Sequence, residues 1–268
     1  MKQNKVVIFF LGTLLASIII ANIISYENKA KNNRQLAIAS QNAVANEKEK
    51  PNSTKTADDS KNTDCKNKKC IALTFDDGPS KYSNEILDIL KSNNAKASFF
   101  YIGTHLSNHV NEVKRTSTEG HDIGNHTWDH INLNKIPDTQ LQDQINRTND
   151  EITKITGQKP VLLRPPFGSL SSKKFSLIGK MSVVQWSVDP DDWKDKDANV
   201  IYDRVMQAVA NGNIVISHEI YQSSVDAYKR IIPDLIKQGY SLVTITDMFD
   251  INPTDPPLKA YYSTNKIL

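Results

Sequence analysis

Short apolar segments recur along the chain between about residue 70 and residue 245. Six of them have the length of buried strands, and their sequences are CIALTF, KASFFYI, PVLLR, MSVVQWSV, NIVIS and YSLVTI. Between several of these segments the apolar residues follow the helical period instead. Alternation of short buried strands with helices is typical of an α/β fold with a parallel sheet.

Three of the intervening segments have helical periodicity, and the longest is the most informative. Its apolar stripe consists of Leu141, Ile145, Thr148, Ile152 and Ile155. Asp138 can cap the start of this helix and Gly157 can end it, and Pro160 prevents the helix from resuming. A further helix is predicted over residues 225–238.

The N-terminal region has a different pattern. Residues 6–24 are almost wholly apolar, which is close to the length that a helix needs to cross a bilayer. A cleavable signal usually has a shorter apolar region with a small-residue cleavage site close behind it, and no such site follows here. We therefore expect residues 1–25 to be an uncleaved anchor, with secretion after cleavage as the alternative. The catalytic part is expected outside the cell membrane, because no second span brings the chain back.

The remaining chain divides by composition. Residues 26–67 are polar without a sustained apolar period, which predicts a flexible linker. We expect the catalytic domain to cover residues 68–252 and a C-terminal tail to cover residues 253–268. Cys65 and Cys70 are the only cysteines of the sequence. In an exported protein they can form a disulfide just ahead of the first strand, and the alternative is two free thiols.

Charge and aromatic content exclude one class of partner. The formal net charge of the 268-residue chain is +3, which is too weak a basic balance to indicate nucleic acid. Aromatic residues are not interleaved with basic ones in the way that base stacking requires. We therefore expect no nucleic-acid partner.

Polar residues follow the ends of several predicted strands. These residues are Asp76, Asp77, Arg164, Asp189, Asp192 and His218. In a β/α barrel the C-terminal ends of all strands open on one face, where active sites lie. Adjacent carboxylates near an apolar interior cost free energy. Of the two interpretations of the segment FDDGP, a surface turn and a chemical role, the chemical role is therefore favoured.

The segment HDIGNHTWDH provides candidate metal ligands. His126 and His130 are four residues apart, so either a helical turn or a loop can bring them together. Two neutral imidazoles and one carboxylate make a three-ligand site with an open position for water. Asp76 or Asp77 can supply the carboxylate. Two histidines at this spacing are, on their own, more often structural than ligands, and the neighbouring acid pair reverses that balance.

Two further motifs accompany these residues. Arg164 opens RPPFGS and can pair with one carboxylate of the acid pair, although in isolation the segment is a proline-rich turn. WSVDPDDW is either a solvated acidic loop or, through Trp186 and Trp193, a wall that faces a sugar. The other histidines of this region are expected to be a support residue, His121, and the surface residues His105 and His109.

Five motifs together resemble a known family. TFDDGP, HTWDH, RPPFG, DPDDW and IVISHE occur in the order found in the polysaccharide deacetylase family, carbohydrate esterase family four, whose domain is known as the NodB homology domain. The resemblance covers about residues 70–250. It implies a distorted β/α barrel, a divalent metal (usually Zn²⁺), and removal of N- or O-acetyl groups from polysaccharides.

The resemblance also implies roles at the metal and at the base. Asp76 corresponds to the general base, and Arg164 corresponds to the residue that orients it. Asp77, His126 and His130 correspond to the metal ligands. A metal in such a site lowers the pKa of bound water and polarises the acetyl carbonyl.

The remaining implied roles concern the acid and the acetyl group. His218 corresponds to the general acid, and Asp192 corresponds to its partner. The implied substrate-binding residues are Phe167, whose backbone N–H would hold the oxyanion, and Trp193 and Ile216, which would wall the acetyl pocket. Glu219 departs from the aspartate that the family typically has after the histidine, and Phe167 stands where tyrosine is frequent.

These features favour a membrane-tethered N-deacetylase that acts as a monomer on N-acetylglucosamine residues of peptidoglycan. Chitin-type oligomers and acetylxylan are alternative substrates. A non-catalytic glycan-binding derivative is a second class of function, but such a protein does not need a base, a metal site and an acid together. A wall-anchored structural protein would explain the N-terminus and leave the motifs unexplained.

Overall fold

The computed structural model describes residue 65 and residues 67–267, which belong to the compact unit Asp59–Leu268. The expected membrane anchor and nearly all of the expected linker therefore lie outside the described residues. In the part of the chain that is described, none of the helices combines the length and the apolar character that a membrane crossing requires.

The described residues form a mostly parallel sheet with strand order β6-β1-β2-β3-β4-β5-β8-β9, and β7 also pairs with β1. The strands are β1 (Lys69–Gly78), β2 (Ser98–Tyr101), β3 (Asp122–Asn125), β4 (Leu162–Leu163), β5 (Ser182–Val184), β6 (Ile214–His218), β7 (Tyr240–Leu242), β8 (Ala260–Ser263) and β9 (Lys266–Ile267). A parallel bridge between Val188 and Val215 links the chain after β5 to β6, so the sheet curls back on itself. The α/β class predicted from the alternating pattern is confirmed.

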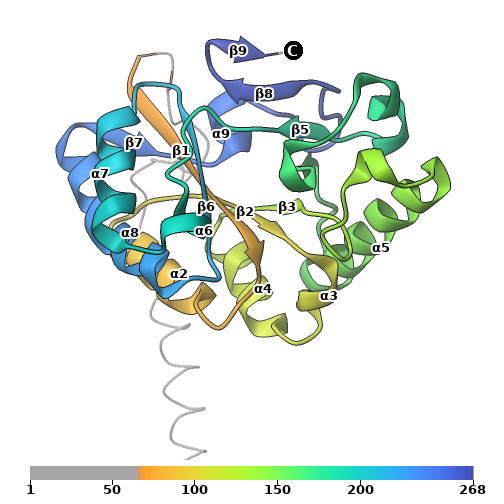
Figure 1. Ribbon diagram of the computed structural model, residues 1–268, viewed down its shortest axis with the longest axis horizontal. Coiled ribbons are helices and arrows are strands. Elements are labelled where there is room, and N and C mark those ends of the chain that lie inside the picture. Colours follow the sequence, from red (N-terminus) through yellow and green to blue (C-terminus); the bar gives the residue numbers. More distant parts are fainter. Residues whose placement is uncertain (1–64, 66, 268) are drawn as a thin grey trace, which may run out of the picture. The chain divides into compact units, whose positions relative to one another are not determined.

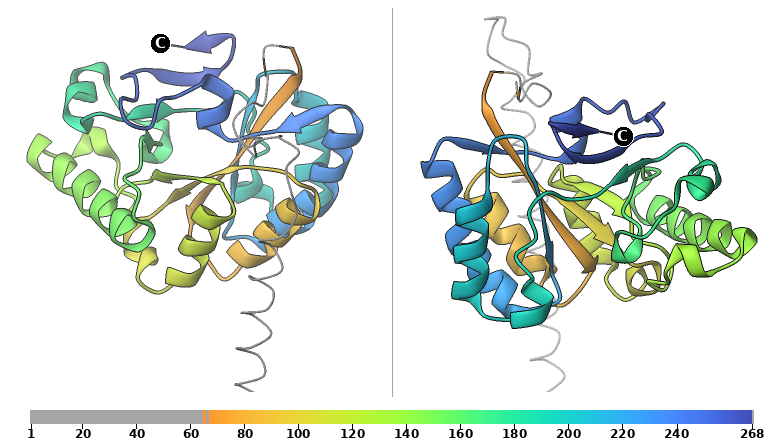
Figure 2. Two further views of the ribbon diagram at one scale, coloured as in Figure 1. Left: turned by 180° about the vertical axis from the view of Figure 1, so that it is seen from behind. Right: turned by 45° about the horizontal axis from the view of Figure 1, so that its top comes forward.

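Helices cover the outside of this curled sheet (Figure 1). They are α2 (Ser83–Ser92), α3 (Gly103–Leu106), α4 (Val110–Thr118), α5 (Asp138–Thr156), α6 (Asp192–Asp195), α7 (Ala198–Ala208), α8 (Gln222–Lys237) and α9 (Ile245–Phe249). Short 3₁₀ turns are η1 (Leu133–Lys135), η2 (Pro166–Gly168) and η3 (Ser172–Ile178). The views in Figure 2 agree that α2, α7 and α8 form one group and that α3, α4 and α5 form another.

The helix predicted from the longest apolar stripe is α5. It ends as expected at Gly157, whose left-handed backbone (φ 75) suits glycine. Asp138 is the first residue of the helix and not its cap, because Pro137 occupies the cap position without a side-chain hydrogen bond.

Aromatic packing fixes the centre of the sheet against the helices. The ring of Phe75 on β1 stacks on Phe99 of β2 at 5.3 Å between centroids and meets the edge of Tyr228 from α8 at 4.8 Å. All three side chains are fully buried. Burial of apolar side chains such as these is the main source of stability in a protein core.

Both ends of the described segment add contacts that the sequence left open. Cys65 and Cys70 form a disulfide at the start of β1. Residues 253–267, expected as a tail, contribute β8 and β9 to the sheet, where Val183 of β5 pairs with Ala260. The C-terminal segment is therefore part of the folded sheet.

Candidate active site

The carboxyl ends of the strands bring the predicted site residues together. In Figure 1, β1 points toward the lower edge of the molecule, away from β8 and β9. Asp76 and His218 are direct partners in the parallel pairing of β1 with β6. His126 follows the last residue of β3, and Arg164 follows the last residue of β4. These side chains, separated by up to 142 positions in the sequence, therefore meet at one end of the sheet.

Asp77, His126 and His130, which we call the metal triad, form a cluster with the geometry of a metal site. Asp77 Oδ1 lies 3.4 Å from Nε2 of His126 and 3.4 Å from Nε2 of His130. This oxygen is buried without a hydrogen-bond partner, so it is an unused acceptor that faces two imidazoles. Within the described residues the metal triad is the group whose donor atoms all lie within 4.8 Å of one another. Two imidazoles, one carboxylate and an open position fit a divalent metal.

Two residues of the metal triad have a left-handed backbone. The φ angles are 68° at Asp77 and 59° at His130. Of the two arrangements that the sequence left open for the histidines, the structure therefore has a loop and not a helical turn. Residues other than glycine are strained in the left-handed conformation, and they keep it only where the surrounding structure holds them.

The pKa shifts of Asp77 and His130 favour the protonation states that bind a metal cation. Burial raises the pKa of Asp77, but the close approach and charge of His126, with smaller contributions from His218 and His130, outweigh it and lower this pKa to about 2. Burial, aided by the charge of His126, lowers the pKa of His130. An ionised carboxylate and a neutral imidazole are the forms that bind a metal.

Asp76 is held next to the metal triad by a buried arginine. Its Oδ1 accepts a hydrogen bond of 2.7 Å from Nη1 of Arg164, and both side chains are almost completely buried. Arg164 also donates to the hydroxyl of Thr74 and to the carbonyls of Val184 and Gln185. The other carboxylate oxygen of Asp76 lies 3.7 Å from Nε2 of His126. Arg164 therefore fixes one oxygen of Asp76 and leaves the other directed toward the metal triad.

His218 is held from behind by a second buried acid. Its Nδ1 and Oδ1 of Asp192 are 2.7 Å apart, and its backbone N–H donates to the other oxygen of Asp192. Ser224 donates a third hydrogen bond to this carboxylate. Burial lowers the pKa of His218, but the hydrogen bond and charge of Asp192 outweigh it and raise this pKa to about 9. His218 is therefore protonated at neutral pH.

The three expected substrate-binding residues have different environments. Phe167 is exposed, has a left-handed backbone (φ 60), and meets the ring of His130 at 4.9 Å between centroids. Trp193 is half exposed on α6, directly after Asp192. Ile216 is buried in β6. Two apolar rings therefore face solvent close to His130 and Asp192, and Ile216 is part of strand β6.

His105, expected to be a surface residue, contacts the site. One of its ring nitrogens lies 3.1 Å from the backbone carbonyl of Asp77, and its side chain is partly buried. This contact involves the backbone of its partner, so no residue pattern in the sequence indicates it. His121, by contrast, lies at the start of β3, where Nδ1 accepts from the backbone N–H of Ala97. Burial lowers the pKa of His121 to about 4, which fits a neutral structural role.

Glu219 is a second residue whose position the sequence did not reveal. It is fully buried, and its Oε1 accepts from the hydroxyl of Ser83. Burial, with the charges of Asp77 and Asp76 adding to it, raises the pKa of Glu219 to about 8 despite its hydrogen bonds. A Cβ on Gly78 would lie 1.7 Å from Oε1 of Glu219. The glycine after the acid pair is therefore required by the side chain that packs on it.

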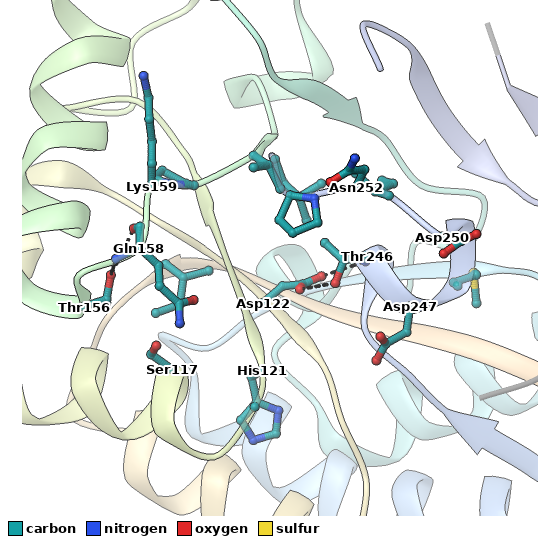
Figure 3. Close-up of a pocket in the computed structure, with 18 of the residues that line it drawn as sticks. Ser117, His121, Asp122, Thr156, Gln158, Lys159, Thr246, Asp247, Asp250 and Asn252 are labelled. Atoms are coloured by element: carbon teal, nitrogen blue, oxygen red, sulfur yellow. Dashed lines mark hydrogen bonds between the residues drawn. The ribbon is translucent and has the colours of Figure 1, made fainter. Parts of the chain in front are cut away.

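A cavity of about 1470 Å³ lies at the opposite end of the sheet (Figure 3). Its lining includes Asp122, the first residue of β3, and Thr246 of α9. Asp122 accepts two hydrogen bonds from Thr246 and one from Ser98. Its partly buried carboxylate thus has three hydrogen bonds within the fold. Because His126 and His130 of the metal triad follow the other end of β3, this cavity is separate from the candidate site.

Comparison with known proteins identifies relatives of this arrangement. Residues 63–186 match the family model described as polysaccharide deacetylase. The peptidoglycan-N-acetylmuramic acid deacetylase PdaC of Bacillus subtilis is 38% identical over 186 residues, which are 69% of this chain and 40% of PdaC. The chain thus spans less than half the length of that relative. A peptidoglycan-N-acetylglucosamine deacetylase of Bacillus cereus is 40% identical over 190 residues, which are 68% of this chain and 69% of that protein.

Solved structures resemble the same part of the chain. The structure of PdaC covers 69% of this chain and 91% of the solved chain, with a TM-score of 0.67 and 42% sequence identity. A CE4 family pseudoenzyme from Bacillus anthracis covers 69% of this chain and 66% of its own, with a TM-score of 0.65 and 32% identity. The resemblance inferred from five motifs is therefore confirmed by sequence and by fold.

Proposed function

The chain belongs to the polysaccharide deacetylase family, and we propose that it is a metal-dependent hydrolase that removes N-acetyl groups from N-acetylglucosamine residues of extracellular peptidoglycan. The observation that carries the proposal is the meeting of the metal triad with two buried ion pairs, Asp76–Arg164 and His218–Asp192, at one end of the sheet. Hydrolysis of an amide needs an activated water, an acceptor for its proton and a donor for the leaving amine. This arrangement offers a group for each.

Asp76 is the proposed general base. A zinc ion or another divalent metal held by the metal triad would polarise the acetyl carbonyl and make a bound water more acidic. Asp76 accepts the proton from the attacking water through the oxygen that Arg164 leaves free. Arg164 keeps this carboxylate in one orientation, because its guanidinium is itself fixed by Thr74 and by two backbone carbonyls. The mixed imidazole and carboxylate donors are compatible with zinc, which the family resemblance favours.

His218 is the proposed general acid. The hydrogen bond between its Nδ1 and Asp192 leaves Nε2 as the position from which a proton can pass to the sugar nitrogen. Protonation lets the amine leave, which an unprotonated amide nitrogen does poorly. The backbone N–H of Phe167, whose ring meets the ring of His130, is the proposed donor to the oxyanion.

Family membership alone does not decide that a protein is active, since a CE4 family pseudoenzyme has a similar fold. A family member without activity therefore has a precedent, and a non-catalytic glycan-binding derivative is the alternative function. The argument for catalysis here is the complete set of ligands, base and acid. Peptidoglycan is favoured because the named relatives act on it, and the two names differ in the sugar that is deacetylated.

Acetate release from purified glycans tests the proposed function. With zinc present, we expect the full-length protein to release acetate from N-acetylated peptidoglycan strands, leaving free amines on glucosamine. Chitin oligomers and acetylxylan are assayed separately as alternative substrates. Treatment with a chelator should abolish acetate release until zinc is restored. Metal-loaded protein that releases no acetate from any of these glycans would support the glycan-binding alternative. Release from acetylxylan alone would contradict the N-deacetylase assignment.

Location in the cell is a further part of the proposal. We propose that residues 1–25 anchor the protein in the membrane as a monomer with its catalytic domain outside the cell, on the basis of the apolar run at residues 6–24. Full-length protein is expected in the membrane fraction and should be degraded when protease is added to intact cells. A variant that lacks residues 1–25 should leave the membrane fraction. Unchanged fractionation of this variant, or protection of the full-length protein from external protease, would contradict the anchor.

A further inference from the structure

The His126–His130 loop, which joins two members of the metal triad, has an unusual backbone. Both Thr127 (φ 67) and His130 (φ 59) are left-handed. Residues without the freedom of glycine adopt this conformation when hydrogen bonds and packing impose it. The partners of the loop backbone therefore determine where the two imidazoles lie.

A buried glutamine of α5 holds the middle of the loop. Oε1 of Gln144 accepts hydrogen bonds from the backbone N–H of Trp128 at 2.9 Å and from the backbone N–H of Asp129 at 3.2 Å. The Gln144 side chain is 3% exposed. One side-chain oxygen thus satisfies two successive backbone donors between the histidine ligands.

A pair of buried asparagines holds the start of the loop. Oδ1 of Asn125 accepts from the backbone N–H of Thr127 at 2.7 Å. Nδ2 of Asn125 donates to Oδ1 of Asn149 at 2.8 Å and to the backbone carbonyl of Ile145 at 2.9 Å. Asn149 therefore orients the amide of Asn125, which in turn fixes the left-handed Thr127.

The opposite side of the loop rests on the start of α3. The backbone N–H groups of Gly103 and Thr104 donate to the carbonyls of Thr127 and Trp128, both at 2.9 Å. A Cβ on Gly103 would lie 2.4 Å from the ring of Trp128, so the contact between α3 and the loop is close. The loop is held between two helices, and α5 supplies its partners through side chains.

We propose that Gln144 and Asn149 of α5 are positioning residues that set the geometry of the metal triad through the His126–His130 loop. The inference rests on the proposed metal-dependent function. Amides suit this task because they accept hydrogen bonds without adding a charge beside the metal ligands. An apolar side chain at either position would leave buried donors without a partner, which is costly. Partners that orient metal ligands typically affect metal affinity strongly.

Cobalt binding to the full-length protein tests this role, because the visible absorption of bound Co²⁺ reports the geometry of its ligands. We expect Gln144→Leu to weaken cobalt affinity by about 10- to 100-fold and to change the absorption spectrum of the bound ion. Gln142→Leu is the matched control, since Gln142 is an exposed glutamine of the same helix, and should match the wild type. Gln144→Glu keeps an acceptor oxygen at the same place, and because its added charge can itself change the affinity, its readout is the absorption spectrum of bound Co²⁺, which should match the wild type.

A second pair of variants tests the same positioning role if Gln144→Leu does not fold. Asn149→Leu removes one hydrogen-bond partner of Asn125, and Asn146→Leu changes an exposed asparagine of α5. Far-ultraviolet circular dichroism confirms that each variant is folded, and we expect a loss of affinity for Asn149→Leu only. Wild-type affinity and spectrum in a folded Gln144→Leu or Asn149→Leu variant would overturn the positioning role. Wild-type protein that binds no cobalt would instead contradict the metal site, and with it both proposals.

Discussion

Asp76→Asn should reduce deacetylation by about 10²- to 10⁴-fold while leaving the metal content of the protein unchanged. The asparagine has nearly the shape of aspartate and keeps an oxygen that can accept from Arg164, but it cannot take a proton from water. Its neighbour Asp77 retains the buried oxygen that faces both histidines. The measurements are the rate of acetate release at saturating glycan and the metal content by elemental analysis.

Asp77→Asn is the matched control, because it makes the same chemical change at the next residue. It removes the charge of a metal ligand, so metal content and activity should fall together. His126→Ala and His130→Ala should behave like Asp77→Asn. If Asp76→Asn loses its metal as completely as Asp77→Asn does, the division of the acid pair into a base and a ligand is wrong.

Stability needs a separate control in this experiment. Asp76→Asn leaves the guanidinium of Arg164 buried without its counter-charge, and breaking a buried pair typically costs about 3–5 kcal/mol. Arg164 keeps its hydrogen bonds to Thr74 and to two carbonyls, which should soften this loss. We therefore expect a lower midpoint of thermal unfolding, and activity should be compared well below that midpoint.

The motifs predicted which residues meet at the candidate site, because several of them lie at or just after the carboxyl end of a strand. Strand β3 escaped prediction since its sequence, DIGN, has neither an apolar run nor a regular alternation. Its place is set by tertiary contacts. Phe100 of β2 lies against Gly124, where an added Cβ would be 2.5 Å from the ring. This fit between neighbouring strands is not visible in the local pattern.

The supporting residues were harder to predict than the reacting ones. His105 contacts a backbone carbonyl, and a histidine in a short helical segment does not indicate this partner. Gln144 and Asn149 did leave a signal, because they are polar residues next to the apolar stripe of α5, close to Thr148. Polar side chains at buried helix positions need partners, and here those partners are Trp128 in the His126–His130 loop and Asn125 directly before it.

The pH dependence of the reaction should reflect His218. Its pKa is raised from 6.5 to about 9 by Asp192, against the effect of burial, so the protonated acid is present below this value and is lost as the pH rises through about 9. The His218–Asp192 pair contributes its full stability below pH 6.5, and this stability is lost as the pH rises from 6.5 through about 9. Asp192→Asn should therefore move the alkaline fall in kcat to lower pH. An unchanged alkaline limb in this variant would show that another group causes it.

His218→Ala should separate the two kinds of leaving group. A sugar amine needs a proton to depart, so loss of the acid should slow release of N-acetyl groups by about 10²- to 10⁴-fold. An activated acetyl ester has a leaving group that departs as a stable anion, and its hydrolysis should fall far less, because the metal triad and Asp76 are unchanged. The measurement is the ratio of the amide rate to the ester rate in the wild type and in the variant, with metal content determined for both proteins. An equal fall for both substrates would remove His218 from the acid role, since a residue that only positions the substrate or the metal triad has no reason to distinguish the leaving groups.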